Sequence, residues 1–131
     1  MRDMVPENLR YATTHEWCRL DGDMVIIGVT EHGVAALGGI IYVELPEEKE
    51  DVLHELPFGE IEGTRDVRDL SSPFDGVVLQ VNSRVVQNPD VLLKDPYEEG
   101  WLVRLKPDSP ASLDNLLSPA DYAERTRKRK G

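Results

Sequence analysis

The hydrophobic positions of this chain fall into short runs that predict mostly β-strands. Residues 16–20 form an extended segment that leads into Asp21-Gly22, a strong signal for a two-residue hairpin turn. The almost continuous apolar run at 24–29 predicts a strand that is covered on both faces. Further strands are expected at 40–45, 58–62, 67–72, 77–82 and 101–106. Short strands separated by turn signals are typical of a small antiparallel β fold.

Two parts of this pattern are specific enough to predict more than a strand. The polar stretch 63–66 lies between two expected strands and predicts the tip of a β-hairpin. At 77–82, the residues Val77, Leu79 and Val81 alternate with Val78 and two polar residues. This alternation predicts a half-buried strand with Val77, Leu79 and Val81 on one face.

Helices are expected around the edges of this β structure. Thr30 can cap a short helix over 30–38, and Gly38 can end it in a left-handed conformation. A helical turn is expected at 90–94. Ser118-Pro119-Ala120-Asp121 combines a cap, a proline at the first helical position and an acid in the first turn, so a helix pair is expected over 111–125.

The composition indicates one globular domain. The chain has 131 residues, of which 40% are hydrophobic and 31% are charged. No apolar run approaches the roughly 20 residues that span a bilayer, and no targeting signal is recognisable at the N-terminus. The single cysteine, Cys18, excludes an internal disulfide and a zinc site made of cysteines alone.

The charge is strongly acidic and unevenly distributed. The 15 basic residues face 25 acids, a net charge of −10, and five of the basic residues fall in the tail 125–131. The rest of the chain therefore has ten bases against 25 acids, a net charge of −15. Such a field repels nucleic acid and anionic membranes and attracts basic partners. The short basic tail is expected to be a solvated end.

Metal binding and catalysis receive little support from the residues themselves. His15, His32 and His54 are 17 and 22 residues apart, and a metal site needs three or four convergent ligands. His15 and Cys18 are three apart in an extended segment, so their side chains should point to opposite faces. Cys18 remains a possible nucleophile with a histidine, but a free cysteine in a strand is usually a small buried hydrophobe. We therefore predict no metal site and no catalytic site.

Several separated motifs resemble one family, the H-protein of the glycine cleavage system. The motifs are Tyr11-Ala-Thr-Thr-His15-Glu16-Trp17, Ile27-Gly28-Val29-Thr30, Val43-Glu44-Leu45-Pro46 and Asp95-Pro96-Tyr97-Glu98-Glu99-Gly100-Trp101-Leu102. The resemblance covers 8–124, which leaves 1–7 as an N-terminal extension and 125–131 as the basic tail. It implies a lipoyl-domain, barrel-sandwich hybrid fold: a flattened barrel of two small antiparallel sheets.

The resemblance also implies a carrier rather than an enzyme. The family's H-protein holds a lipoyl arm on a lysine at a hairpin tip. This arm takes an aminomethyl group from glycine decarboxylase, delivers it to aminomethyltransferase and is reoxidised by dihydrolipoyl dehydrogenase. These three enzymes are thus the expected partners of a monomer in the cytoplasm, or in a matrix-like compartment if a presequence has been removed.

The chain departs from the family pattern at the attachment site. The segment 59–76 aligns without a gap and keeps Glu62 and Asp69, but Arg65 stands at the lipoyl-lysine position. Acylation needs a neutral amine, which lysine can supply, whereas a guanidinium stays protonated. No lysine lies between Lys49 and Lys94. We therefore expect an unlipoylated protein without a cofactor.

The family's arm cleft would fall at Thr14, Glu16 and Asp69, and carboxylates there would bind a protonated amine. Without an arm, these residues could hold a free cation, or Arg65 and Arg68, or could be ordinary surface acids. Three hypotheses remain open. The chain is a non-shuttling H-protein paralogue, a repurposed binding module that uses its acidic face and an Arg65/Arg68 tip, or, least favoured, a small enzyme that uses Cys18.

Overall fold

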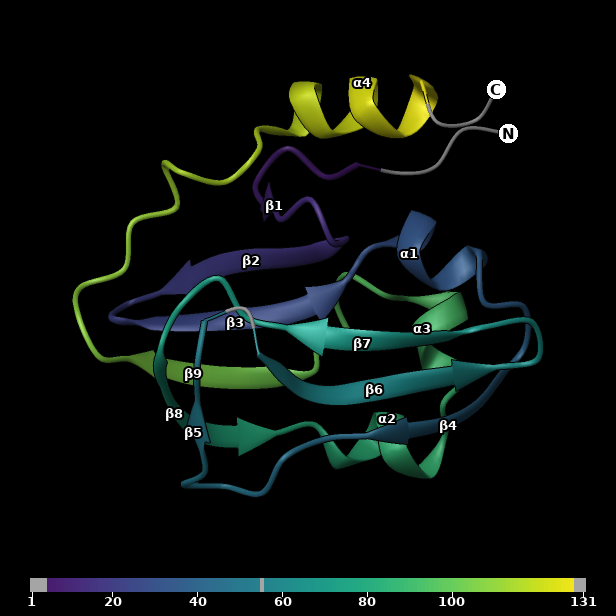
Figure 1. Ribbon diagram of the computed structural model, residues 1–131, viewed down its shortest axis with the longest axis horizontal. Coiled ribbons are helices and arrows are strands. Elements are labelled where there is room, and N and C mark those ends of the chain that lie inside the picture. Colours follow the sequence, from purple (N-terminus) through teal and green to yellow (C-terminus); the bar gives the residue numbers. More distant parts are fainter. Residues whose placement is uncertain (1–4, 55, 129–131) are drawn as a thin grey trace.

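Two antiparallel sheets form the body of the protein. The computed structural model describes residues 5–54 and 56–128. The strands are β1 (Arg10–Tyr11), β2 (Glu16–Asp21), β3 (Met24–Val29), β4 (Ile40–Glu44), β5 (Asp51–Val52), β6 (Pro57–Gly63), β7 (Val67–Ser71), β8 (Gly76–Val81) and β9 (Val103–Pro107). One sheet has the order β1-β2-β3-β9-β8-β5, and the other has the order β4-β6-β7 (Figure 1).

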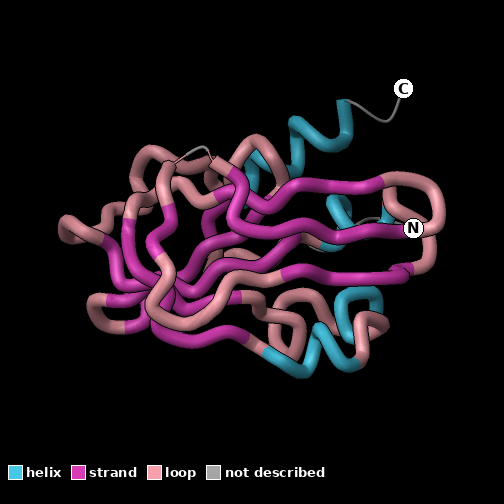
Figure 2. Tube along the Cα trace, turned by 60° about the horizontal axis from the view of Figure 1, so that its bottom comes forward, coloured by secondary structure: helices cyan, strands magenta, loops and turns pink. Residues whose placement is uncertain are grey.

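The core lies between the two sheets, as expected for a flattened sandwich. Ile27 and Leu105 of the six-stranded sheet and Ile61 and Leu70 of the three-stranded sheet are fully buried in one hydrophobic cluster. Figure 2 shows the helices at the periphery of the strands. The predicted mainly β architecture is confirmed, and its stability comes from burying the apolar side of each sheet.

The first hairpin forms where the sequence predicts it. Asp21 of β2 pairs with Met24 of β3, so the two turn residues are Gly22 and Asp23 rather than Asp21 and Gly22. Gly22 has a φ of +65°, a conformation that glycine adopts without steric cost. Five consecutive residues of β3, from Val25 to Val29, are buried, which confirms that both its faces are covered.

The short helices are α1 (Glu31–Ala35), α2 (Ser83–Gln87) and α3 (Val91–Lys94). Thr30 caps α1 as predicted, because its hydroxyl accepts a hydrogen bond from the Gly33 amide at 3.0 Å. Gly38 has a φ of +79° but follows α1 by three residues instead of ending it. The sequence reading missed α2, which Asn82 caps by accepting from the Arg84 amide at 3.2 Å.

The C-terminal region contains one helix, α4 (Pro119–Lys128), within the described residues, so the predicted helix pair over 111–125 is wrong. Leu117 instead exchanges backbone hydrogen bonds with Tyr11 at 2.8 and 3.0 Å, and the Asp114 amide donates to the Ser112 hydroxyl. Hydrogen bonds of this kind, both between neighbouring residues and between distant segments of the chain, compete with helix formation. The helix α4 crosses the predicted boundary between 124 and 125, and 129–131 lie outside the described residues.

The strand β8 buries a different face from the predicted one. Val78 is fully buried and Leu79 is 42% exposed. Val78 pairs with Leu105, but Gln80 pairs with Arg104, so Leu79 is an extra residue in β8. This β-bulge reverses the inward and outward alternation, which a strict period of two cannot anticipate.

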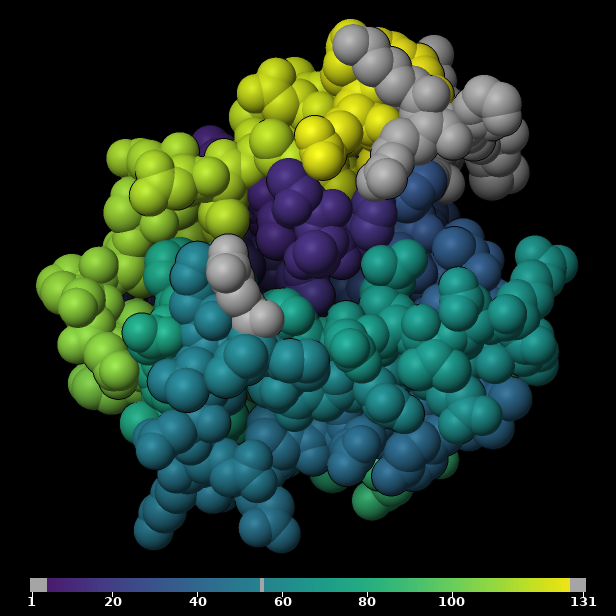
Figure 3. Space-filling view, in the orientation of Figure 1, coloured from purple at the N-terminus to yellow at the C-terminus, as the bar shows by residue number. Residues whose placement is uncertain are grey.

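The helix α4 packs over the N-terminal segment (Figure 1). A second hydrophobic cluster holds Tyr11, Trp17 and Tyr122, and the rings of Tyr11 and Tyr122 stack with centroids 4.6 Å apart. In Figure 3 the purple N-terminal segment lies between the yellow C-terminal helix and the teal β6–β7 hairpin. None of the helices in the described residues is both long and apolar enough to span a membrane.

Candidate functional site

The β6–β7 hairpin carries Arg65 at its tip, held by backbone contacts. The Thr64 amide donates to the Gly39 carbonyl at 2.8 Å, and the Arg65 amide donates to the Leu37 carbonyl at 2.9 Å. The Gly39 amide donates in turn to the Thr64 hydroxyl at 3.1 Å. The backbone of the tip is therefore fixed on the segment between α1 and β4, while the Arg65 side chain is exposed to solvent.

Two glycines allow this close approach. A Cβ atom at Gly38 would collide with the Thr64 hydroxyl, and one at Gly63 would collide with the Leu37 carbonyl. Gly38 also has a positive φ that other residues rarely adopt. The sequence thus specifies a defined hairpin tip, on which the Arg65 side chain is exposed to solvent.

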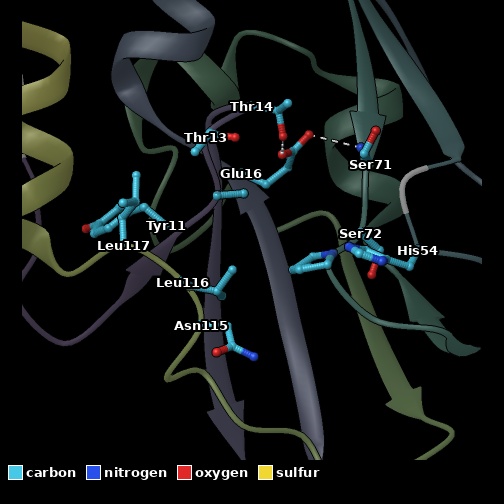
Figure 4. A pocket seen from close by; sticks show the side chains of 12 residues that line it. Tyr11, Thr13, Thr14, Glu16, His54, Ser71, Ser72, Asn115, Leu116 and Leu117 are labelled. Carbon is cyan, nitrogen blue, oxygen red and sulfur yellow. Dashed lines mark hydrogen bonds between the residues drawn. The ribbon is translucent and has the colours of Figure 1, made fainter.

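Glu16 is a buried carboxylate at the start of β2. Its side chain is 1% exposed, and it accepts hydrogen bonds from the Thr14 hydroxyl and, at 2.9 Å, from the Ser71 amide of β7 (Figure 4). Burial raises the pKa of Glu16, whereas these two hydrogen bonds and the positive charge of Arg68 lower it. The structure therefore brings together Thr14 and Glu16, two of the three residues expected at the arm cleft.

A pocket of about 390 Å³ opens beside this carboxylate. Its lining comes from the N-terminal segment, from the turn after β5, from the end of β7 and from the segment before α4. The lining residues are Tyr11, Ala12, Thr13, Thr14, Glu16, His54, Ser71, Ser72, Pro73, Asn115, Leu116 and Leu117. Figure 4 shows Glu16 directed between Thr14 and Ser71, with His54 and Ser72 nearby and Asn115 and Leu116 on the opposite side.

Sequence reasoning missed several of these lining residues. Ser71 contributes its backbone amide, which every residue except proline offers, so its side-chain type gives no signal. His54 and Asn115 are far from Glu16 in sequence and reach the pocket only through the tertiary fold.

Arg68 points to the inner side of the three-stranded sheet. It pairs with the fully buried Ile61, and paired residues of antiparallel strands project to the same face. Its Nε donates to the Gly33 carbonyl of α1 at 3.2 Å. Arg65 and Arg68 therefore do not form a joint tip, and that part of the binding-module hypothesis needs correction.

Asp69 and Glu62 lie on the opposite, outer face of this sheet. Asp69 pairs with Glu60, and Glu60 pairs with Glu44, so three carboxylates form a row across three strands. Val67 pairs with Glu62, and both neighbour this row. Asp69 is exposed and does not line the pocket beside Glu16, so the structure does not bring it together with Thr14 and Glu16.

The described residues contain no group of three or more histidine, cysteine or acidic side chains that could hold a metal ion. Cys18 is fully buried, and burial raises the pKa of its thiol, which opposes formation of a nucleophilic thiolate. His15 has a φ of +78°, so it is not extended as the sequence predicts, and its Nδ1 lies 2.7 Å from the Tyr122 hydroxyl. The predicted buried, structural role of Cys18 is confirmed.

Comparison with known proteins places this arrangement in one class, the lipoyl-domain type of barrel-sandwich fold. A family model described as "Glycine cleavage H-protein" matches residues 9–129. A crystal structure of a glycine cleavage system H protein from Mycobacterium marinum aligns with a TM-score of 0.86 and 33% sequence identity, covering 94% of this chain and 99% of that one. The chain belongs to the glycine cleavage H-protein family.

Curated relatives agree with this assignment. The glycine cleavage system H protein of Rubrobacter xylanophilus is 42% identical over 121 residues, which cover 92% of this chain and 94% of that protein. The mitochondrial H protein 3 of Arabidopsis thaliana is 38% identical over 120 residues, which cover 92% of this chain and 72% of that protein. Members of this family are lipoyl carriers rather than catalysts and interact with the other proteins of the glycine cleavage system.

Proposed function

We propose that this protein is an H-protein-like component of the glycine cleavage context that carries no lipoyl group at its hairpin tip and does not shuttle the aminomethyl group. The observation that supports this proposal is Arg65, which occupies the exposed tip of a hairpin whose backbone is held by hydrogen bonds to the carbonyls of Leu37 and Gly39. By family resemblance this tip corresponds to the attachment site, and the side chain at the attachment position is a guanidinium.

The chemical reason is the availability of a nucleophile. Transfer of a lipoyl group forms an amide bond between an activated carboxyl carbon and an amine nitrogen with a free lone pair. The lone pairs of a guanidinium are delocalised and the group stays protonated near neutral pH, so it offers no such nitrogen. The neighbouring chain offers no substitute, because no lysine occurs between Lys49 and Lys94.

Intact-mass spectrometry tests the missing modification. The protein is co-expressed with a lipoyl ligase in medium supplemented with lipoate, next to a lipoylated H-protein from a relative as a positive control. We expect the control to gain the mass of one lipoyl group and this chain to keep its unmodified mass. A lipoyl adduct on this chain would refute the proposal.

We also propose that the protein still binds the partner enzymes of its family. By family relationship these are glycine decarboxylase, aminomethyltransferase and dihydrolipoyl dehydrogenase, bound by a monomer in the cytoplasm. A protein that docks but cannot carry the cargo should compete with a lipoylated H-protein. Adding an excess of this chain should therefore slow glycine decarboxylation that depends on the lipoylated protein, whereas absence of any binding to the three enzymes would contradict retained docking.

A second candidate function is that of an unlipoylated binding module for a different partner, one that carries a basic surface. The row formed by Glu44, Glu60 and Asp69 supports it, because like charges that face each other across strands are unfavourable until a cation neutralises them. This candidate is favoured if the protein does not bind the three enzymes and instead binds a basic protein with an affinity that falls steeply as the salt concentration rises.

A further inference from the structure

A buried chain of hydrogen bonds joins the C-terminal helix α4 to the rest of the domain. The Tyr122 hydroxyl of α4 lies 2.7 Å from the Nδ1 atom of His15 and 2.7 Å from the Oγ1 atom of Thr30. All three residues are buried. The Thr30 hydroxyl also accepts a hydrogen bond from the Gly33 amide at 3.0 Å. The chain of hydrogen bonds therefore runs from His15 through Tyr122 and Thr30 to the first turn of α1.

The number of protons decides the direction of these hydrogen bonds. The contact between His15 and Tyr122 and the contact between Tyr122 and Thr30 each have room for one proton, and the two hydroxyl groups supply two. Tyr122 can then donate to Nδ1 of His15, while Thr30 donates to the oxygen of Tyr122. A proton on Nδ1 would be a third proton for two contacts. Burying a polar hydrogen without an acceptor is costly, so this arrangement requires a neutral His15 with its proton on Nε2.

A positive charge on His15 would also meet an unfavourable environment. The His32 ring of α1 lies with its centroid 4.9 Å from that of His15, and two charged imidazoles at this distance repel each other. The acid that follows His15, Glu16, has its carboxylate bonded to an amide at the end of β7 instead. Within the described residues, the titratable residues that contact His15, Thr30 or Tyr122 or adjoin them in sequence are Tyr11, Glu16, Glu31, His32, Asp121 and Tyr122 itself.

We propose that His15, Tyr122 and Thr30 form an acid-sensitive latch, which holds α4 on the domain while His15 is neutral and opens when His15 takes up a proton. Opening separates Tyr122 from His15 and exposes the imidazole to water, where a histidine binds a proton near about pH 6.5. The closed form binds fewer protons at this site than the open form does. The latch is therefore most stable above that pH and loses stability as the pH falls below it. This device involves neither Arg65 nor lipoylation, so it is independent of the proposed function.

Nuclear magnetic resonance tests the protonation state that the latch requires, without any substitution. In uniformly ¹⁵N-labelled protein at about pH 7.5, long-range correlations between the ring protons and ring nitrogens of His15 show which nitrogen is protonated. We expect Nε2 to be protonated and Nδ1 to be unprotonated. A proton on Nδ1 of His15 would overturn the proposal.

Hydrogen exchange tests the opening of the latch. The protection factors of the α4 amides, corrected for the intrinsic exchange rate at each pH, are expected to fall about tenfold between about pH 7.5 and about pH 5.5. His15→Asn cannot take up the proton, provides a carbonyl oxygen as acceptor and tolerates the φ of +78° at this position. This variant should lose the pH dependence. The matched control, His54→Asn, replaces an exposed histidine outside the latch and should keep it.

The second histidine of the cluster needs a variant of its own. His32→Asn leaves His15 and its contact with Tyr122 in place, so the α4 amides should still lose protection in acid. Loss of the pH dependence in His32→Asn, its persistence in His15→Asn, or equal protection of wild-type α4 at both pH values would overturn the proposal. If His15→Asn does not fold, the ring-nitrogen measurement and His32→Asn still decide.

Discussion

At the scale of single residues, Arg65 and Glu16 determine what the protein can do chemically. Arg65 lies in solvent at a hairpin tip whose backbone is held by hydrogen bonds, so its side-chain type sets the chemistry that the tip offers. Glu16 lies out of solvent, where burial and its hydrogen bonds with Thr14 and Ser71 decide its charge. The chemistry at Arg65 depends on its side-chain type, whereas the charge of Glu16 depends on the residues that surround it.

Arg65→Lys should allow partial lipoylation. The backbone of the tip is already fixed, so a lysine there would project into solvent with an available amine. Gly63, Thr64 and Asp66 differ from the family's tip residues, so we expect less than complete modification by a lipoyl ligase. Intact mass measures the modified fraction. Arg68→Lys is the control, because that lysine would point inward and should stay unmodified.

Glu16→Gln should change how stability depends on pH. Burial raises the folded-state pKa of Glu16 above its ordinary value of 4.5, so at pH values between the two pKa values the folded state binds more protons than the unfolded state. This contribution to stability is complete below pH 4.5 and is lost as the pH rises through the folded-state pKa. The unfolding free energy of the wild type relative to Glu16→Gln should therefore fall as the pH rises from 4.5.

Urea unfolding at a series of pH values measures this difference. Glu48→Gln, which removes an exposed acid by the same substitution, serves as the matched control. A difference between the wild type and Glu16→Gln that stays constant across pH would contradict a raised pKa for Glu16.

At the scale of elements, the three-stranded sheet separates two chemical surfaces. Its inner face carries Ile61, Arg68 and Leu70, and its outer face carries the row of Glu44, Glu60 and Asp69. Figure 3 shows the β6–β7 hairpin uncovered on this side of the molecule. The alternation of side chains along a strand thus places Arg68 and Asp69, which are neighbours in sequence, on opposite faces.

Glu60→Gln should stabilise the protein, because Glu60 is the middle member of the row and faces a carboxylate on each side. Relief of cross-strand repulsion is expected to add about 0.5 kcal/mol to the free energy of unfolding at low salt, and less at high salt. Thermal or urea unfolding at two salt concentrations tests this. Glu48→Gln, outside the row, should raise the free energy of unfolding by less. An equal increase in both variants would show that the effect comes from net charge alone.

At the scale of the whole molecule, one tyrosine near the C-terminus connects distant parts of the fold. The Tyr122 hydroxyl lies 2.7 Å from both His15 Nδ1 and Thr30 Oγ1, and its ring stacks on Tyr11. Thr30 also caps α1, so α4, α1 and the start of the six-stranded sheet share one buried hydrogen-bonded cluster. The C-terminal helix is therefore an integral part of the domain.

Tyr122→Phe should destabilise the protein by about 1–3 kcal/mol, because it keeps the stacked ring but leaves buried polar atoms of His15 and Thr30 without that partner. Urea unfolding measures the change. Tyr42 is 48% exposed, so Tyr42→Phe serves as the control and should have little effect. Equal stability of Tyr122→Phe and the wild type would show that the buried cluster contributes nothing.

The features of this protein that depend on local chemistry could be predicted from the amino-acid sequence. Alternating hydrophobicity and turn residues predicted the strands β2, β3, β4, β6 and β7, and Thr30 identified the start of α1, because such signals act within a few residues. The identity of Arg65 decided the proposed loss of lipoylation without reference to any contact.

The tertiary structure alone decided the rest, because it depends on residues far apart in the chain. A bulge opposite β9 reversed the buried face of β8, and the pairing of Leu117 with Tyr11 replaced a predicted helix. Alternation alone puts Arg68 and Asp69 on opposite faces, but only the strand pairing shows that the face of Arg68 is the inner one. Burial, charge at a distance and strand register are collective quantities, and the folded chain as a whole sets them.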